Sequence, residues 1–137
     1  MSFVLDSSVS LSWCFDDERT DATDALLERV VEAGADAPAL WSLEVLNALA
    51  MAERRQRIDA ERRQRLAGLL RDLPVAIDEE TASQAWVVTS QLAARFQLTV
   101  YDAAYLELAQ RRGLPLATLD QELRAAAAAL GVTLLGT

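Results

Sequence analysis

The sequence predicts an α/β fold, a three-layer domain in which a parallel β-sheet of about four to five strands is flanked by helices. Short apolar runs alternate along the chain with longer segments whose apolar residues recur at helical spacing. These helical segments are long enough to serve as the crossovers that parallel strands require. A length of 137 residues and a hydrophobic content of 52% are typical of one domain, and we expect residues 1–137 to form it.

The first half of the chain opens with a strand at residues 3–5, whose consecutive apolar side chains indicate burial on both faces. Polar residues, a glycine or a proline bound each element that follows. The predicted elements are a short helix over residues 9–15, a helix over residues 20–33 closed by Gly34, a short strand over residues 35–38, a helix over residues 40–52, and a helix that follows Ile58 and Asp59 and ends at Pro74.

The second half repeats the alternation of strand and helix, with glycines as helix stops. The predicted elements are a strand over residues 75–77, a helix over residues 81–96, a helix over residues 99–112 stopped by Gly113, a strand over residues 116–119, a helix over residues 122–130 stopped by Gly131, and a final strand over residues 132–135. Strands therefore alternate with helices along the whole chain, as a covered parallel sheet requires.

Composition excludes most catalytic chemistries. The chain has no His, and all 13 of its basic residues are Arg. Nucleophiles that depend on a histidine base, Schiff-base lysines and phosphate-binding lysine loops are therefore absent. The single Cys14 has no partner for a disulfide or a zinc site, and we expect a buried thiol. What remains is carboxylate chemistry, either in pairs, as in glycosidases, or around hard cations such as Mg²⁺ or Mn²⁺.

Four acids occupy positions that this fold brings together: Asp6, Glu44, Asp102 and Asp120. Asp6 and Asp120 follow strands, and ligands of open parallel sheets bind beyond the carboxyl ends of strands where the strand order reverses. Glu44 and Asp102 lie in the first turns of helices that can converge there. Asp6 follows a buried strand, where an unpaired carboxylate is costly unless a cation compensates. We therefore expect the four acids to hold one or two Mg²⁺ or Mn²⁺ ions for phosphodiester hydrolysis.

Each acid also has an ordinary structural explanation, because all four lie near helix starts. A carboxylate there is stabilised by the helix dipole, by about 0.3–1 kcal/mol. Thr99 and Asp102 have the spacing of a capping box, and Asp120 alone fits an N-cap. A cap on the helix after Asp6 explains Ser7 and Ser8 at least as well as a functional role does. The case for a site rests on the four acids taken together.

Charge is unevenly distributed along the chain. The net charge is −8, but residues 52–72 hold seven Arg against four acids, and this Arg strip spans the predicted helical hairpin. The Arg strip is either a solvated helix surface or a contact for an RNA backbone or an acidic partner segment. Trp13, Trp41 and Trp86 are more typical of core or interface anchors than of base-stacking platforms.

The N-terminal residues lack the basic start and long apolar run of a secretory signal, and no stretch is long and apolar enough to cross a bilayer. We therefore expect a cytoplasmic protein without membrane contact.

The ordered motifs resemble a PIN domain over essentially the whole chain. They are the strand leading into Asp6, Ser7 and Ser8, then Glu44 early in a helix, YDAAYL at residues 101–106 and LATLD at residues 116–120. Length and the spacing of the acids resemble in particular the VapC toxins of bacterial toxin–antitoxin pairs. This resemblance implies a PIN-like three-layer fold.

The resemblance also implies an activity and partners. It implies a Mg²⁺- or Mn²⁺-dependent endoribonuclease that cuts cellular RNA, forms a homodimer and is held inactive by a cognate VapB-like antitoxin. Asp6 and Asp102 would be the principal metal ligands, Glu44 and Asp120 would complete the acidic site, and Ser8 or Thr118 would position water or phosphate. Many relatives have Asn where this chain has Ser8, which leaves the role of that hydroxyl open.

Other functions fit the residues less well. A phosphotransfer receiver domain would need a Lys, which the chain lacks, and a haloacid-dehalogenase-like phosphatase would need an Asp where Ser8 stands. A glycosidase needs an aromatic-lined cleft, and the aromatic content is only 6%. The remaining alternative is a catalytically silent PIN-like module that binds a partner through the Arg-rich helical hairpin.

Overall fold

The structure is a computed structural model that describes residues 2–137, and its centre is a five-stranded parallel sheet with the strand order β3-β2-β1-β4-β5. The predicted α/β class with a parallel sheet is confirmed. The strands are short: β1 (Val4–Leu5), β2 (Ala35–Ala37), β3 (Val75–Ile77), β4 (Leu116–Ala117) and β5 (Leu134–Leu135).

The chain order of the strands creates a switch point between β1 and β4. From β1 the chain adds β2 and β3 toward one edge, and it then crosses over to add β4 and β5 on the other side. Val4 pairs with Leu116 and Leu5 with Ala117, so the residues after these two strands emerge side by side. This is the place where the carboxyl ends of an open sheet leave a crevice.

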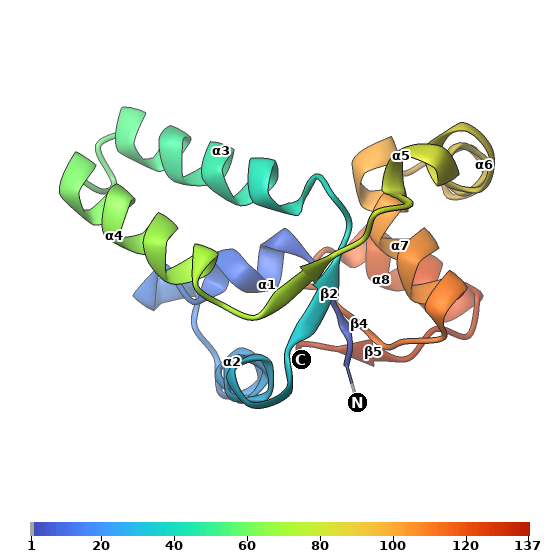
Figure 1. The fold of residues 1–137 in the computed structure, drawn as a ribbon, viewed down its shortest axis with the longest axis horizontal. Coiled ribbons are helices and arrows are strands. Elements are labelled where there is room, and N and C mark those ends of the chain that lie inside the picture. Colours follow the sequence, from blue (N-terminus) through green and yellow to red (C-terminus); the bar gives the residue numbers. More distant parts are fainter. Residues whose placement is uncertain (1) are drawn as a thin grey trace.

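Helices cover the sheet on two sides (Figure 1). The helices α1–α4 lie on one side and α5–α8 on the other, so the fold has three layers, and the α3–α4 hairpin extends beyond the sheet. The helices are α1 (Ser7–Ser12), the short 3₁₀ turn η1 (Asp16–Glu18), α2 (Asp21–Ala33), α3 (Trp41–Arg54), α4 (Ala60–Arg71), α5 (Thr81–Gln84), the π-helical turn η2 (Ala85–Thr89), α6 (Ser90–Phe96), α7 (Val100–Arg112) and α8 (Gln121–Ala129).

The predicted boundaries hold where local chemistry defines them. Thr20 caps α2 by accepting a hydrogen bond from the backbone N–H of Thr23, and Asp59 caps α4 in the same way through Arg62. Gly34 ends α2 at a φ of 82°, and a Cβ there would lie 3.0 Å from the carbonyl oxygen of Pro74. Glycine is therefore required at the point where α2 turns into β2.

Several predicted elements differ from the structure. The helix expected over residues 81–96 is interrupted by the π-helical turn η2, which sequence periodicity does not reveal. The strands expected over residues 116–119 and 132–135 are shorter, since Thr118 and Leu119 already belong to the segment that leads into the acidic site.

The core contains the apolar faces of all three layers. Phe3, Val4 and Leu5 are fully buried, as the apolar run at the start of the sequence predicts. Trp13 and Trp41 are buried in the core, whereas Trp86 is 87% exposed, so of the two expected roles, core or interface anchor, the core role applies only to Trp13 and Trp41. Cys14 is buried as expected, and burial raises the pKa of its thiol to about 11.

Within residues 2–137, none of the helices combines the length and the apolar character needed to cross a lipid bilayer.

Candidate functional site

Asp6 stands at the carboxyl end of β1 and is 3% exposed. Its Oδ2 atom accepts hydrogen bonds from the hydroxyls of Ser8 at 2.6 Å and Thr118 at 2.7 Å. Burial raises the pKa of Asp6, although these hydrogen bonds oppose the rise. The structure therefore keeps a carboxylate in a dry position, where its negative charge is unfavourable without a cation.

Ser8 and Thr118 connect Asp6 to the segment after β4. The Ser8 hydroxyl also accepts a hydrogen bond from the backbone N–H of Leu119 at 3.0 Å, and the Thr118 hydroxyl accepts one from the N–H of Asp120 at 3.1 Å. The N-cap of α1 is Asp6 and makes no side-chain cap bond. The hydroxyl of Ser8 thus orients Asp6 and joins two strand ends, which differs from the helix cap that the sequence allowed.

Glu44 lies in the first turn of α3, and its Oε1 atom accepts a hydrogen bond of 2.6 Å from the Tyr105 hydroxyl. Burial raises the pKa of Glu44; the Tyr105 hydrogen bond lowers it, and the nearby charge of Asp6 raises it further. Tyr105 is fully buried and therefore holds the Glu44 carboxylate in one orientation. Sequence reasoning did not assign Tyr105 to the site, although it follows Asp102 by three residues and so shares its helix face.

Asp102 occupies the first turn of α7, and Thr99 caps this helix by accepting the N–H of Asp102 at 3.1 Å. Burial raises the pKa of Asp102 to about 6, with further contributions from the charges of Asp6, Asp120 and Glu44, in that order. Asp102 therefore lies within electrostatic range of all three other acids. The structure gathers the four predicted residues around one place.

Asp120 is the N-cap of α8, and its Oδ1 atom accepts a hydrogen bond of 2.8 Å from the N–H of Leu123. The capping interpretation is therefore correct for this side chain. Asp120 also has a second effect, because its charge raises the pKa of Asp102. One carboxylate both caps a helix and adds negative charge to the site.

The donor chemistry of these four side chains fits a hard divalent cation. All four present carboxylate oxygens, and none takes part in an ion pair within residues 2–137. In the same part of the chain, no group of three or more Asp, Glu or Cys side chains is arranged to hold an ion as it stands. The Tyr105 hydroxyl and the N–H of Leu123 each donate to one oxygen of Glu44 and of Asp120, and each carboxylate has a second oxygen that can ligate an ion while this hydrogen bond is kept.

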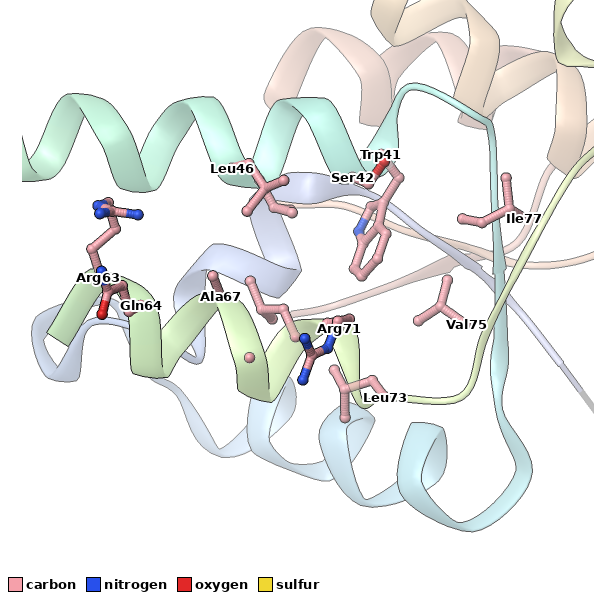
Figure 2. A pocket seen from close by; sticks show the side chains of 13 residues that line it. Trp41, Ser42, Leu46, Arg63, Gln64, Ala67, Arg71, Leu73, Val75 and Ile77 are labelled. Atoms are coloured by element: carbon pink, nitrogen blue, oxygen red, sulfur yellow. The ribbon is translucent and has the colours of Figure 1, made fainter. Parts of the chain in front are cut away.

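A separate pocket of about 540 Å³ lies between α3, α4 and the edge strand β3 (Figure 2). Its lining is mainly apolar, with Trp41 and Leu46 from α3, Ala67 from α4 and Val75 and Ile77 from β3. Two arginines of the Arg strip, at positions 63 and 71, also line it. An apolar floor with basic residues beside it is suited to a polypeptide segment that carries both apolar and acidic side chains.

The Arg strip itself is partly engaged within the chain. Arg57 stacks over Phe15 at 3.9 Å and pairs with Asp17 at 2.8 Å, and Arg63 pairs with Glu53. Arg54 and Arg65 make no ion pair within residues 2–137 and are exposed. Part of the strip therefore stabilises the fold, and part is available to a negatively charged partner.

Together, the parallel sheet with its switch point and the four uncompensated acids beside it define the class of protein: an α/β protein with an acidic site at the carboxyl edge of its sheet. The chain belongs to the PIN domain family, whose model matches residues 3–129. The search of curated proteins found no relative that matches this sequence.

Solved structures share this fold at low sequence identity. PAE2754 from Pyrobaculum aerophilum has a TM-score of 0.70 and 24% identity, with 98% of this chain and 83% of that chain covered. FitAcB from Neisseria gonorrhoeae has a TM-score of 0.67 and 16% identity over 98% and 96% of the two chains. The Mycobacterium tuberculosis toxin VapC20, described as cleaving the sarcin-ricin loop, has a TM-score of 0.59 and 16% identity over 91% and 95%.

Proposed function

We propose that this chain is a metal-dependent endoribonuclease that acts as the toxin of a toxin–antitoxin pair. The observation that carries the proposal is the convergence of Asp6, Glu44, Asp102 and Asp120: burial, and then the charges of the other three acids, raise the pKa of Asp102 to about 6. Such a set of acids, in a chain without His or Lys, is suited to divalent cations and to little else. The structural likeness to a toxin described as cleaving the sarcin-ricin loop supports RNA as the substrate.

The residues of the acidic site have different roles. Asp6 and Asp102 would hold Mg²⁺ or Mn²⁺, with Glu44 and Asp120 completing the set. When bound, the cation supplies the positive charge that phosphodiester displacement requires and that the acidic side chains lack. Ser8 and Thr118 fix the orientation of Asp6, and Tyr105 fixes that of Glu44.

A cleavage assay with purified protein tests the proposal. RNA cleavage should require Mg²⁺ or Mn²⁺, stop with EDTA, and fall by about a hundredfold or more in Asp6→Asn and Asp102→Asn. Asp120→Asn should also lower the rate, whereas Asp59→Asn, at an N-cap outside the site with the same kind of hydrogen bond, should not. Asn caps helices as well as Asp does, so this pair separates capping from chemistry.

Full activity in Asp6→Asn would refute the carboxylate site. Absence of RNA cleavage under every metal condition, combined with tight binding of a partner, would instead favour the alternative of a silent PIN-like module that binds through its Arg-rich hairpin.

The pocket between α3 and α4 supports a second part of the proposal, that an antitoxin docks there. The structural neighbours include VapBC2 from Rickettsia felis bound to a promoter DNA fragment and FitAB bound to DNA. Arg71, whose side chain is 80% exposed beside the apolar floor, favours an amphipathic segment with acidic residues, whereas Arg63 at the same pocket already pairs with Glu53. Ile77→Glu, at a position 45% exposed, should release a co-expressed antitoxin and leave RNA cleavage intact. Unchanged co-purification would place the antitoxin elsewhere.

We also propose that the chain forms a homodimer.

A further inference from the structure

Three arginines at the free end of the α3–α4 hairpin carry charge that the chain does not neutralise. Arg54 is the last residue of α3, Arg55 is its C-cap, and Arg65 lies in the first half of α4. All three side chains are exposed, and none of them makes an ion pair within residues 2–137. We call these three residues the Arg tip.

The Arg tip belongs to a basic segment on an acidic protein. Residues 53–65 hold six Arg against three acids, a local charge of +3, whereas the whole chain has a net charge of −8. Two of the three acids are already engaged, because Glu53 pairs with Arg63 and Asp59 caps α4. The hairpin projects beyond the sheet (Figure 1), so its positive charge is displaced from the acidic body of the protein. Such a projection is suited to an anionic partner.

The surroundings of the Arg tip favour phosphate groups over a protein segment. From Arg54 to Arg65 no large apolar side chain is exposed, and Ile58 is buried. Protein interfaces depend on apolar and aromatic anchors, and in this hairpin those lie at the other end, in the pocket beside β3. Guanidinium groups bind phosphate oxygens through paired hydrogen bonds and need no apolar neighbours. The backbone of a nucleic acid therefore fits this surface better than an antitoxin segment does.

Helix α3 connects the Arg tip to the acidic site. Glu44 lies in its first turn and Arg54 is its last residue, ten positions further along. At ~1.5 Å per residue, this separation is about 15 Å along the helix axis. Stacked nucleotides advance by ~3.4 Å each, so about four to five nucleotides cover the same distance. One RNA strand can therefore contact both places.

We infer that the Arg tip is an anchor for the phosphate backbone of the RNA substrate, remote from the acidic site. This inference rests on RNA as the substrate of the proposed function. A protein of net charge −8 repels RNA as a whole, and a cation in the acidic site would offset that repulsion only where the strand is cut. The Arg tip provides a second attachment, and the substrate that uses it extends at least about four to five nucleotides beyond the cut.

Fluorescence anisotropy with a labelled single-stranded RNA of about 20 nucleotides, in EDTA, tests the inference over a range of KCl concentrations. Arg54→Gln/Arg65→Gln should weaken binding by about tenfold or more at low salt. It should also reduce the slope of log affinity against log salt by about 1.4, because each lost phosphate contact accounts for ~0.7. Arg19→Gln/Arg29→Gln is the matched control, with the same change in charge beside and on α2, and should weaken binding by about twofold at most. Circular dichroism should show that both variants are folded.

Wild-type protein that does not bind this RNA, equal losses in the two double variants, or an unchanged salt slope in Arg54→Gln/Arg65→Gln would each overturn the inference. Unchanged RNA affinity combined with loss of a co-expressed antitoxin would assign the Arg tip to the antitoxin instead. Because the binding assay contains no metal and requires no cleavage, a loss specific to the Arg tip stands even if nuclease activity is absent. Where cleavage is observed, the loss should appear in KM rather than in kcat, as an anchor remote from the reacting phosphate requires.

Discussion

Asp102→Asn should make the metal-free protein more stable at neutral pH. The folded state raises the pKa of Asp102 from 3.8 to about 6, first through burial and then through the charges of Asp6, Asp120 and Glu44. Asp102 therefore favours folding fully below pH 3.8, and this contribution is lost as the pH rises through about 6. Above that pH the ionised carboxylate is a cost, and Asn removes the charge while keeping the shape.

The size of the gain follows from the pKa. A rise from 3.8 to about 6 corresponds to at most about 3 kcal/mol, because one pKa unit is ~1.4 kcal/mol. Asp102 is only half-buried, and water screens part of the repulsion, so we expect a gain of about 1–2 kcal/mol at pH 7.5. The loss of a favourable helix-dipole interaction in the first turn reduces this by about 0.3–1 kcal/mol.

Urea denaturation in EDTA at pH 7.5 and pH 4 measures the effect for wild type and variant. The gain should be present at pH 7.5 and small at pH 4, where wild-type Asp102 is already protonated. Asp21→Asn, an exposed acid in the first turn of α2, measures the dipole contribution alone and should destabilise slightly. Mg²⁺ or Mn²⁺ should stabilise wild type and not Asp102→Asn. A variant no more stable than wild type at pH 7.5, or equally stabilised at both pH values, would refute this reasoning.

Two further predictions concern Tyr105, which contacts the acidic site, and Asp78, which contacts the last turn of α7. Tyr105→Phe removes the hydroxyl that donates to Glu44, so the pKa of Glu44 should rise further, and the acid limb of the pH–rate profile should move to higher pH, which an unchanged profile would contradict. Asp78 is 1% exposed and accepts from Arg111 at 2.6 Å; burial raises its pKa, but the hydrogen bonds, first that of Arg111, bring it below the usual value. Asp78→Asn should cost about 2 kcal/mol in urea melts at pH 7, an effect that shrinks as the pH falls and Asp78 of wild type becomes protonated; a loss of equal size at pH 3 would contradict the assigned ion pair.

The sequence was sufficient to predict that acidic residues gather at one edge of the sheet, but not the side-chain contacts that hold them there. Asp6 and Asp120 follow strands, and the alternation of strands with long crossovers places such residues at one edge of the sheet. The hydrogen bond between Tyr105 and Glu44 joins α7 to α3, and no local pattern encodes a contact between residues so far apart in the chain. Trp86 shows a related limit, since apolar residues at helical spacing look alike in the sequence whether they face the core or solvent, and Trp86 is 87% exposed.

The placement of α7 explains how the fold tolerates its acidic site. Residues 103–109 of this helix are all buried, so it packs against neighbours on every side. Its first turn carries Asp102, whose ionisation opposes folding, and its last turn carries Arg111, which pairs with Asp78 and Glu107 at 2.6 and 2.7 Å. A helix fixed by burial and by an ion cluster at its far end cannot move away to relieve the repulsion at its start. The repulsion is therefore retained in the folded protein and is available to be relieved by a bound cation, which is how a site can gain affinity at the expense of stability.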